Sequence, residues 1–323
     1  NLEALKQMDL FTVEAGAVTV ARSLAILAPI TILGIITVYV WCQVLFPSRK
    51  TENGKTEKPS TTKSLMNPHP SMNELGLVAD HDETRSAAIE VVVKQDKQAV
   101  SHELCTLVAK KAEEAIIKRG EFVFAVSGGT VLDSLANLRL DKYNVWWPKA
   151  TMIYVNHECV APTNEQSVHA QAMKKFGNAL KLRVVVPPVV GGNGGDGIKE
   201  AAEYQRAIDE AGIKNIDLVL LGLGADGHVG SLNPESPEIA SNHMGYIASK
   251  KQGMVSSITM SMEMMNSAEQ VAVVVVGGDD GKKEAVDRAL SRTEPRGVFP
   301  VQSLDAPLFI LDSEAAELAD YYL

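Results

Sequence analysis

Short apolar runs of strand length recur from residue 89 to the end of the chain, and helical segments separate most of them. In the clearest helical segments, 99–118 and 197–211, apolar residues recur at a spacing of three and four. The apolar runs cover 89–93, 122–126, 151–155, 183–186, 217–223, 271–276 and 307–311. Apolar strands that alternate with helices are typical of a sheet covered on both faces. We therefore predict an α/β domain over residues 85–323, with a doubly wound, mostly parallel, Rossmann-like sheet covered by helices.

One longer apolar segment precedes this pattern. Residues Ser23–Phe46 contain no charged side chain, and as a helix they would extend about 36 Å, enough for a hydrocarbon core of about 30 Å. A secretory signal usually has a shorter apolar region after a basic stretch, whereas residues 1–22 contain both acidic and basic side chains. A core helix of a soluble domain would show a polar face. The segment is predicted to be one transmembrane α-helix, with the membrane bilayer as its partner.

The residues after the apolar segment predict its orientation. Five basic residues follow it closely, namely Arg49, Lys50, Lys55, Lys58 and Lys63. The positive-inside rule places such a flank on the cytoplasmic side of a membrane, or on the equivalent stromal or matrix side. Residues 47–84 are rich in Ser, Thr, Pro, Lys and Asn, which is typical of a polar tether. The α/β domain is therefore expected on that side of the membrane.

The first residue suggests where this membrane lies. The sequence begins at Asn1 without a methionine, so removal of a presequence is the expectation, as in an organelle-targeted precursor. The expected location is the chloroplast thylakoid or the mitochondrial inner membrane, and the sequence does not choose between the two.

Composition narrows the classes of ligand. The formal net charge is −9 at pH 7, and no basic stripe with interleaved aromatic residues is present, so nucleic acid is not an expected partner. The three cysteines, Cys42, Cys105 and Cys159, are widely spaced. This spacing argues against a disulfide framework and against a structural zinc site. No metal and no cofactor are expected.

The most informative motif is a glycine-rich turn that follows the buried run 217–223. It presents Asp226 and His228 at the carboxyl end of a predicted strand, where open α/β sheets bind their ligands. A histidine there can act as a general base near neutral pH. The alternative is a tight turn in which both side chains make only local hydrogen bonds.

A second turn, Ser127-Gly128-Gly129-Thr130, follows the run 122–126 and precedes a predicted helix. Glycine allows a ligand to approach the backbone closely, and a helix start offers free N–H groups that suit a phosphate. Alone, such a turn is more often a simple strand-to-helix corner. Together, the two turns predict one cleft that both of them line.

These motifs resemble the 6-phosphogluconolactonase family, part of a wider group that includes glucosamine-6-phosphate deaminases. The likeness extends over about residues 85–323. It includes the two turns, Ser231-Leu232, Asp217-Leu218-Val219, Ile258-Thr259-Met260 with Asn266, Gly281-Lys282, and Asp312 with Ala315-Ala316.

The resemblance implies hydrolysis of the ring ester of 6-phosphogluconolactone, a step of the pentose phosphate pathway. His228 would take a proton from the attacking water, and Asp226 would orient the imidazole. The Ser127–Thr130 turn would contact the sugar phosphate. The implied substrate-binding residues also include Asn156, His157 and Lys282, with solvent exposure at a helix end as the alternative for Lys282.

Four positions depart from the family pattern. The family's Asp-Glu-Arg is Asn156-His157-Glu158 here, its Ser-Asn is Ser167-Val168, its second arginine is Ser257, and a phenylalanine is Asn233. The general base is thus retained while the cations expected around the phosphate are lost.

Two functions of different class follow. The chain is either a lactonase-like protein with impaired or lost activity, acting as a subunit of a larger membrane complex, or an active membrane-anchored lactonase. A sugar-phosphate enzyme has no evident need of a membrane span, which favours the first. The retained Asp226-Gly227-His228 favours the second.

Overall fold

The computed structural model describes residues 89–143, 147–189, 196–250, 255–278, 281–319 and 321. The predicted amino-terminal segment 1–22, the transmembrane helix 23–46 and the polar tether 47–84 lie outside these residues. Among the described helices, none combines the length and the apolar character that a bilayer crossing requires.

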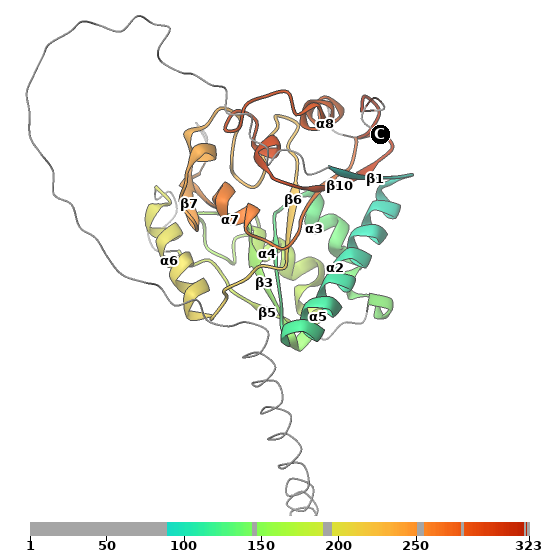
Figure 1. Ribbon diagram of the computed structural model, residues 1–323. Coiled ribbons are helices and arrows are strands. Elements are labelled where there is room, and N and C mark those ends of the chain that lie inside the picture. The colour runs from blue at the N-terminus through green and yellow to red at the C-terminus, as the bar shows by residue number, and fades with distance from the viewer. Residues whose placement is uncertain are drawn as a thin grey trace, which may run out of the picture. The chain divides into compact units, whose positions relative to one another are not determined.

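A seven-stranded parallel sheet forms the centre of the described domain, in the order β1-β10-β9-β6-β2-β3-β5 (Figure 1). Its strands are β1 (Glu90–Lys94), β2 (Phe122–Val126), β3 (Ala150–Tyr154), β5 (Arg183–Val184), β6 (Leu218–Gly222), β9 (Val271–Val275) and β10 (Leu308–Asp312). Each overlaps one of the seven predicted apolar runs. The prediction of a mostly parallel α/β sheet is therefore confirmed.

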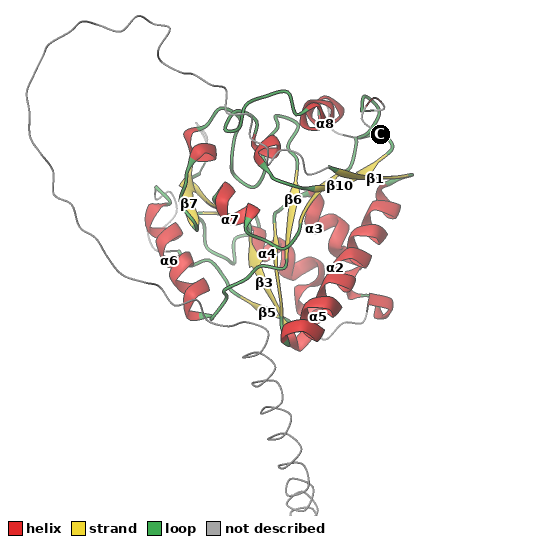
Figure 2. Ribbon diagram, in the orientation of Figure 1, coloured by secondary structure: helices red, strands yellow, loops and turns green. Residues whose placement is uncertain are grey.

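Helices connect these strands (Figure 2). The α-helices are α2 (Lys97–Arg119), α3 (Thr130–Ser134), α4 (Val168–Ala172), α5 (Asn178–Leu180), α6 (Ile198–Glu210), α7 (Met262–Asn266) and α8 (Lys282–Ser291). The short 3₁₀ helices are η2 (Leu135–Arg139), η3 (Asp141–Tyr143), η4 (Trp147–Lys149), η6 (Pro237–Ala240) and η7 (Pro300–Ser303). The segment η5 (Met173–Gly177) is a π-helical turn. The two predicted helices correspond to α2 and α6.

A second, antiparallel sheet was not predicted. It joins β4 (Asn156–Glu158), β8 (Ser257–Met260) and β7 (Tyr246–Ser249) in that order. Its strands have three or four residues each, too short for a clear alternating pattern. This small sheet packs against α6 and brings β4 beside the end of β3.

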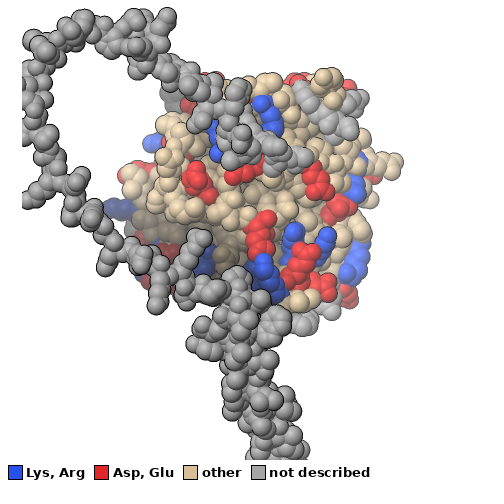
Figure 3. Space-filling model, in the orientation of Figure 1, with Lys and Arg blue, Asp and Glu red and all other residues tan. Residues whose placement is uncertain are grey.

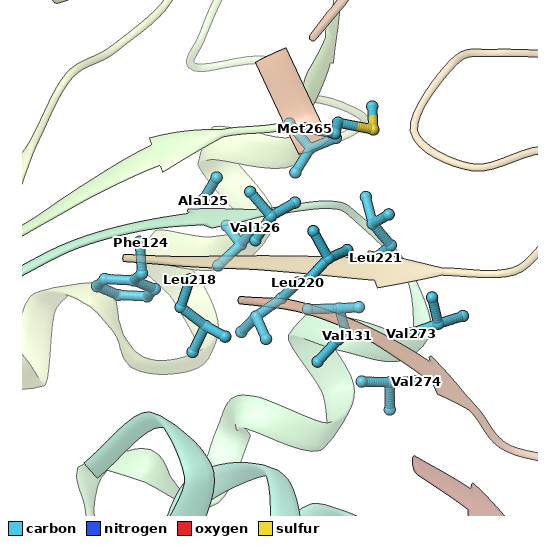
Figure 4. Close-up of a cluster of buried hydrophobic side chains, with 14 of the residues drawn as sticks. Phe124, Ala125, Val126, Val131, Leu218, Leu220, Leu221, Met265, Val273 and Val274 are labelled. Carbon is cyan, nitrogen blue, oxygen red and sulfur yellow. The ribbon is translucent and has the colours of Figure 1, made fainter. Parts of the chain in front are cut away.

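The core lies between the central strands and their covering helices. Side chains of β2, β6 and β9 interdigitate with those of α3 and α7, as Figure 4 shows for Phe124, Leu220, Val273, Val131 and Met265. All five are buried. At the surface, Figure 3 shows acidic and basic side chains interspersed on the visible face.

A buried ion pair ties the end of α2 to two strands. The Arg119 guanidinium pairs with Asp217, whose side chain is 2% exposed, and the second Asp217 oxygen accepts the Val123 N–H at 2.8 Å. Arg119 also pairs with the half-exposed Glu269 at 2.9 Å. Because Asp217 directly precedes β6, this contact fixes the amino end of the strand that carries the Asp226–His228 turn.

Candidate functional site

The candidate site lies where the order of strand connections reverses. From β2 the chain continues to the neighbouring β3, whereas from β6 it continues to β9 on the other side. β2 and β6 are themselves neighbours, so the loops at their carboxyl ends diverge and leave a crevice. Open α/β sheets bind ligands at this kind of point.

A cleft of about 520 Å³ occupies this crevice. Seven of the nine predicted site residues line it: Ser127, Gly128, Gly129, Thr130, Asn156, His228 and Lys282. The remaining lining residues are Glu158, Val168, Gln171, Gly222, Leu223, Gly224, Ala225 and Gly230. The two predicted turns therefore meet in one cleft, whereas Asp226 and His157 do not line it.

Asp226 acts on the cleft through His228. Its Oδ1 lies 2.5 Å from His228 Nδ1, and the same oxygen accepts the His228 backbone N–H at 3.3 Å. A carboxylate at Nδ1 selects the tautomer in which Nδ1 carries the proton, leaving Nε2 as an acceptor. Both side chains are a little less than half exposed. This is the geometry of an oriented general base that water can reach.

Two glycines make room for this pair. A Cβ on Gly224 would lie 2.2 Å from His228 Nδ1 and 2.6 Å from Asp226 Oδ1. Gly227 has a φ of +90°, and a Cβ there would lie 2.0 Å from Phe299 Cε2. The turn that presents the imidazole therefore needs glycine on both sides of Asp226.

The Ser127–Thr130 turn has a structural role as well as its place in the cleft. The Ser127 hydroxyl accepts the Gly222 N–H at 3.0 Å, and its backbone N–H donates to the Leu220 carbonyl at 3.1 Å. These bonds join the ends of β2 and β6. The helix that follows, α3, has only five residues, so the helix-dipole contribution expected from the sequence is small here.

One wall of the cleft comes from β4. Side chains alternate along a strand, so Asn156 and Glu158 face the cleft while His157 faces the other way. Asn156 Nδ2 donates to Ser231 Oγ at 3.2 Å. Asn156 Oδ1 and Glu158 Oε2 are buried without a partner among the described residues. Burial raises the pKa of the Glu158 carboxyl, although backbone hydrogen bonds partly oppose this.

His157 is buried behind this wall. The residue is 2% exposed. Its ring packs near Tyr154, and Nδ1 lies 2.7 Å from the Glu158 carbonyl oxygen. Burial lowers its pKa from 6.5 to about 4. The imidazole is thus neutral near pH 7 and has no direct route to a ligand in the cleft.

The two positions where the family resemblance implies arginine lie side by side. Glu158 on β4 and Ser257 on β8 are direct partners in the antiparallel ladder. Both departures therefore remove positive charge from one place beside the cleft. Among the described lining residues, Lys282 alone carries a permanent positive charge, and its ammonium donates to the Leu223 carbonyl at 2.5 Å.

Two lining residues belong to α4: Val168 is one of the departures from the family pattern, whereas Gln171 has no distinguishing signal in the sequence. Ser167 caps α4 by accepting the Ala170 N–H at 3.0 Å, and the Val168 side chain lies beside Gly128 of the Ser127–Thr130 turn. In the part of the chain that the structure describes, no group of three or more His, Cys, Asp or Glu is arranged to hold a metal ion.

Comparison with known proteins agrees with the fold and the motifs. The chain is 28% identical over 256 residues to a probable 6-phosphogluconolactonase 2 of Oryza sativa subsp. indica, covering 72% of this chain and 90% of the relative. It superimposes on the 6-phosphogluconolactonase of Leishmania guyanensis with a TM-score of 0.62 at 19% identity, covering 71% of this chain and 98% of the other. For the enzyme of Trypanosoma brucei the TM-score is 0.58 at 22% identity, with coverage of 72% and 99%.

The family model described as glucosamine-6-phosphate isomerases/6-phosphogluconolactonase matches residues 95–307, which is more than half of the chain. With the sheet order and the cleft at the strand reversal, this match shows that the chain belongs to the glucosamine-6-phosphate isomerase/6-phosphogluconolactonase family.

Proposed function

We propose that this chain is a membrane-anchored, 6-phosphogluconolactonase-like protein whose activity toward 6-phosphogluconolactone is impaired or lost, and which serves as a subunit of an organellar membrane complex. The lactonase part of the proposal is supported by the family and by the names of the relatives. The anchoring part is supported by the uncharged segment Ser23–Phe46 and the basic residues after it.

The main support for the proposed loss of activity is the presence of Glu158 at the cleft. Its carboxyl lines the cleft, its neighbour in the ladder is Ser257, and the resemblance implies arginine at both positions. A charge-assisted hydrogen bond to phosphate contributes about 1.5–3 kcal/mol. Loss of two such bonds weakens binding of a phosphorylated lactone by at least about a hundredfold, since about 1.4 kcal/mol is tenfold.

The alternative function is an active 6-phosphogluconolactonase, and the Asp226–His228 contact at the cleft favours it. In that mechanism His228 Nε2 takes a proton from water, and the water oxygen bonds to the lactone carbonyl carbon. The ring C–O bond then breaks, and the ring oxygen takes up the proton, giving 6-phosphogluconate. The Lys282 ammonium lies beside this turn and would stabilise the oxyanion.

Hydrolysis of 6-phosphogluconolactone by the full chain in mild detergent tests the two functions. We expect a rate near the spontaneous background for the wild-type protein and for His228→Ala alike. Replacing Glu158 and Ser257 by arginine together should raise the rate, because it restores positive charge for the phosphate while Asp226 and His228 are retained. Wild-type turnover well above background that vanishes in His228→Ala would contradict the impaired function and establish the active enzyme.

The proposed setting is the thylakoid or mitochondrial inner membrane, with the α/β domain on the stromal or matrix side. The proposed partners are the bilayer, a larger membrane protein complex and a sugar-phosphate ligand, but not nucleic acid. Solubilisation of the native membrane followed by native electrophoresis tests the complex. We expect the chain to migrate in a particle far larger than 34.8 kDa, and migration as a single chain would contradict the subunit role.

A further inference from the structure

A second cavity shares a lining residue with the cleft and has a more basic lining. It has a volume of about 560 Å³, and Gln171 lines both cavities. Three basic side chains line it, Arg139, Lys174 and Lys175, together with one carboxylate, Glu165. We call it the basic pocket. Its three cations contrast with the cleft, whose lining contains one lysine, Lys282, and one carboxylate, Glu158.

Two of these cations are available to a ligand. Lys175 is paired with Asp133 on α3. Arg139 and Lys174 are exposed, and neither forms an ion pair with a carboxylate of the described residues. A concave site lined by unpaired cations of two neighbouring segments attracts an oxyanion. No internal ion pair has to break before these cations can bind it.

The local fold holds these cations in place. Arg139 ends η2, which packs against the π-helical turn η5 that carries Lys174 and Lys175. Gly177 leaves room for the Met173 side chain within this turn, because a Cβ there would lie 2.1 Å from Met173 Cε. Single π turns inside helices are frequent at functional sites.

We propose that the basic pocket is an anion subsite, which receives the phosphate monoester group of a polyhydroxylated ligand whose other end lies in the cleft. This inference rests on the proposed ligand class of that cleft. The subsite compensates for the charge lost at Glu158 and Ser257, but on the other side of Gln171. A ligand bound in this way is displaced along α4, so its reacting carbonyl is no longer aligned with His228, and binding persists without efficient hydrolysis.

Calorimetric titration of the full chain in mild detergent with 6-phosphogluconate and gluconate tests the subsite, because these two ligands differ only in the phosphate group. We expect the wild-type protein to bind 6-phosphogluconate at least about tenfold more tightly, the contribution of one charge-assisted contact. The double variant Arg139→Ala with Lys174→Ala should lose this preference. Glu165→Gln should increase it, because it removes the repelling carboxylate.

The matched control is Lys110→Ala with Lys214→Ala, which removes the same charge from exposed positions that line neither cavity. It should keep the preference for 6-phosphogluconate. All the altered side chains are exposed, and unfolding in urea verifies that each variant is folded.

The outcomes separate the subsite from the proposed function. If the Arg139 and Lys174 variant keeps the preference while Glu158→Arg strengthens it, phosphate binds in the cleft, and the subsite is refuted although the cleft remains a sugar-phosphate site. If the wild-type protein binds neither ligand, both the subsite and the proposed ligand class are refuted.

Discussion

At the scale of single residues, one strand of three residues decides the character of the cleft. The sequence Asn156-His157-Glu158 departs from the family pattern, and the consequences of this departure depend on strand alternation. The structure turns Glu158 toward the cleft and buries His157 behind it. The family resemblance implies a substrate contact at His157, but no pattern in so short and polar a segment indicates which side chains share a face.

The buried His157 predicts a pH dependence of stability. The unfolded chain takes up a proton at this residue below about pH 6.5, whereas the folded protein does so only near pH 4. The unfolded state therefore binds more protons within this window, so the free energy of unfolding falls as the pH falls, by up to about 3 kcal/mol. Urea unfolding at pH 7 and pH 5 should show a smaller decrease for His157→Gln than for the wild-type protein. Equal decreases in the two proteins would show that His157 does not contribute.

Gly227 offers a test of the turn that presents His228. Gly227→Ala combines an unfavourable φ of +90° with a methyl group 2.0 Å from Phe299. Gly120, after α2, has a φ of +83° but open space around its Cβ position, and is therefore a matched control. We expect a loss of about 1 kcal/mol for Gly120→Ala and at least about 1 kcal/mol more for Gly227→Ala, measured by urea unfolding. Equal losses of stability in the two variants would mean that the Phe299 ring moves aside with no loss of free energy.

At the scale of elements, the long apolar strands were predictable and the short ones were not. The five inner strands β2, β3, β6, β9 and β10 are buried on both faces, which leaves continuous apolar runs in the sequence, whereas the edge strands β1 and β5 are partly exposed. β4, β7 and β8 form through tertiary contacts and are partly polar. The cations of the basic pocket were also missed, because η2 and η5 meet in space although the sequence gives no common pattern for Arg139 and Lys174.

The contact between α2 and β6 through Asp217 predicts a large effect on stability. Asp217→Ala would leave the partly buried Arg119 without its main partner and the Val123 N–H without its acceptor. The lost charge-assisted hydrogen bond costs about 1.5–3 kcal/mol, and the unsatisfied Val123 N–H costs about 1–3 kcal/mol more. Glu269→Ala removes the half-exposed partner of the same arginine and should cost less than about 1 kcal/mol. Thermal or urea unfolding compares the two, and similar losses would refute the role assigned to Asp217.

At the scale of the whole molecule, the order of strands, helices and glycine-rich turns along the sequence predicted where the cleft lies. Buried strands alternating with helices predicted a parallel sheet, and glycine-rich turns after two of them indicated where a ligand binds. The structure makes these two strands, β2 and β6, neighbours at the reversal of connections. The sequence alone does not determine that pairing, because many strand orders satisfy the same pattern of apolar runs.

The proposed anchor gives a prediction for the entire chain. If Ser23–Phe46 spans the bilayer, the full chain should remain in the membrane pellet after alkaline carbonate extraction, whereas a chain without residues 23–46 should appear in the supernatant. The physical reason is burial of a 24-residue apolar segment in hydrocarbon, which carbonate does not reverse. Recovery of both proteins in the supernatant would contradict the anchor.

The hydrogen bond between the Ser127 hydroxyl and the Gly222 N–H affects how sequences related to this chain should be compared. Folding alone accounts for a hydroxyl at position 127, because that hydroxyl accepts an N–H that would otherwise be unsatisfied between two central strands. A lineage released from catalysis would still be selected to keep it. The Asp226 carboxylate also holds the backbone N–H of His228, so it too has a local structural role, and the persistence or drift of the His228 imidazole among descendants is the better record of whether turnover is under selection.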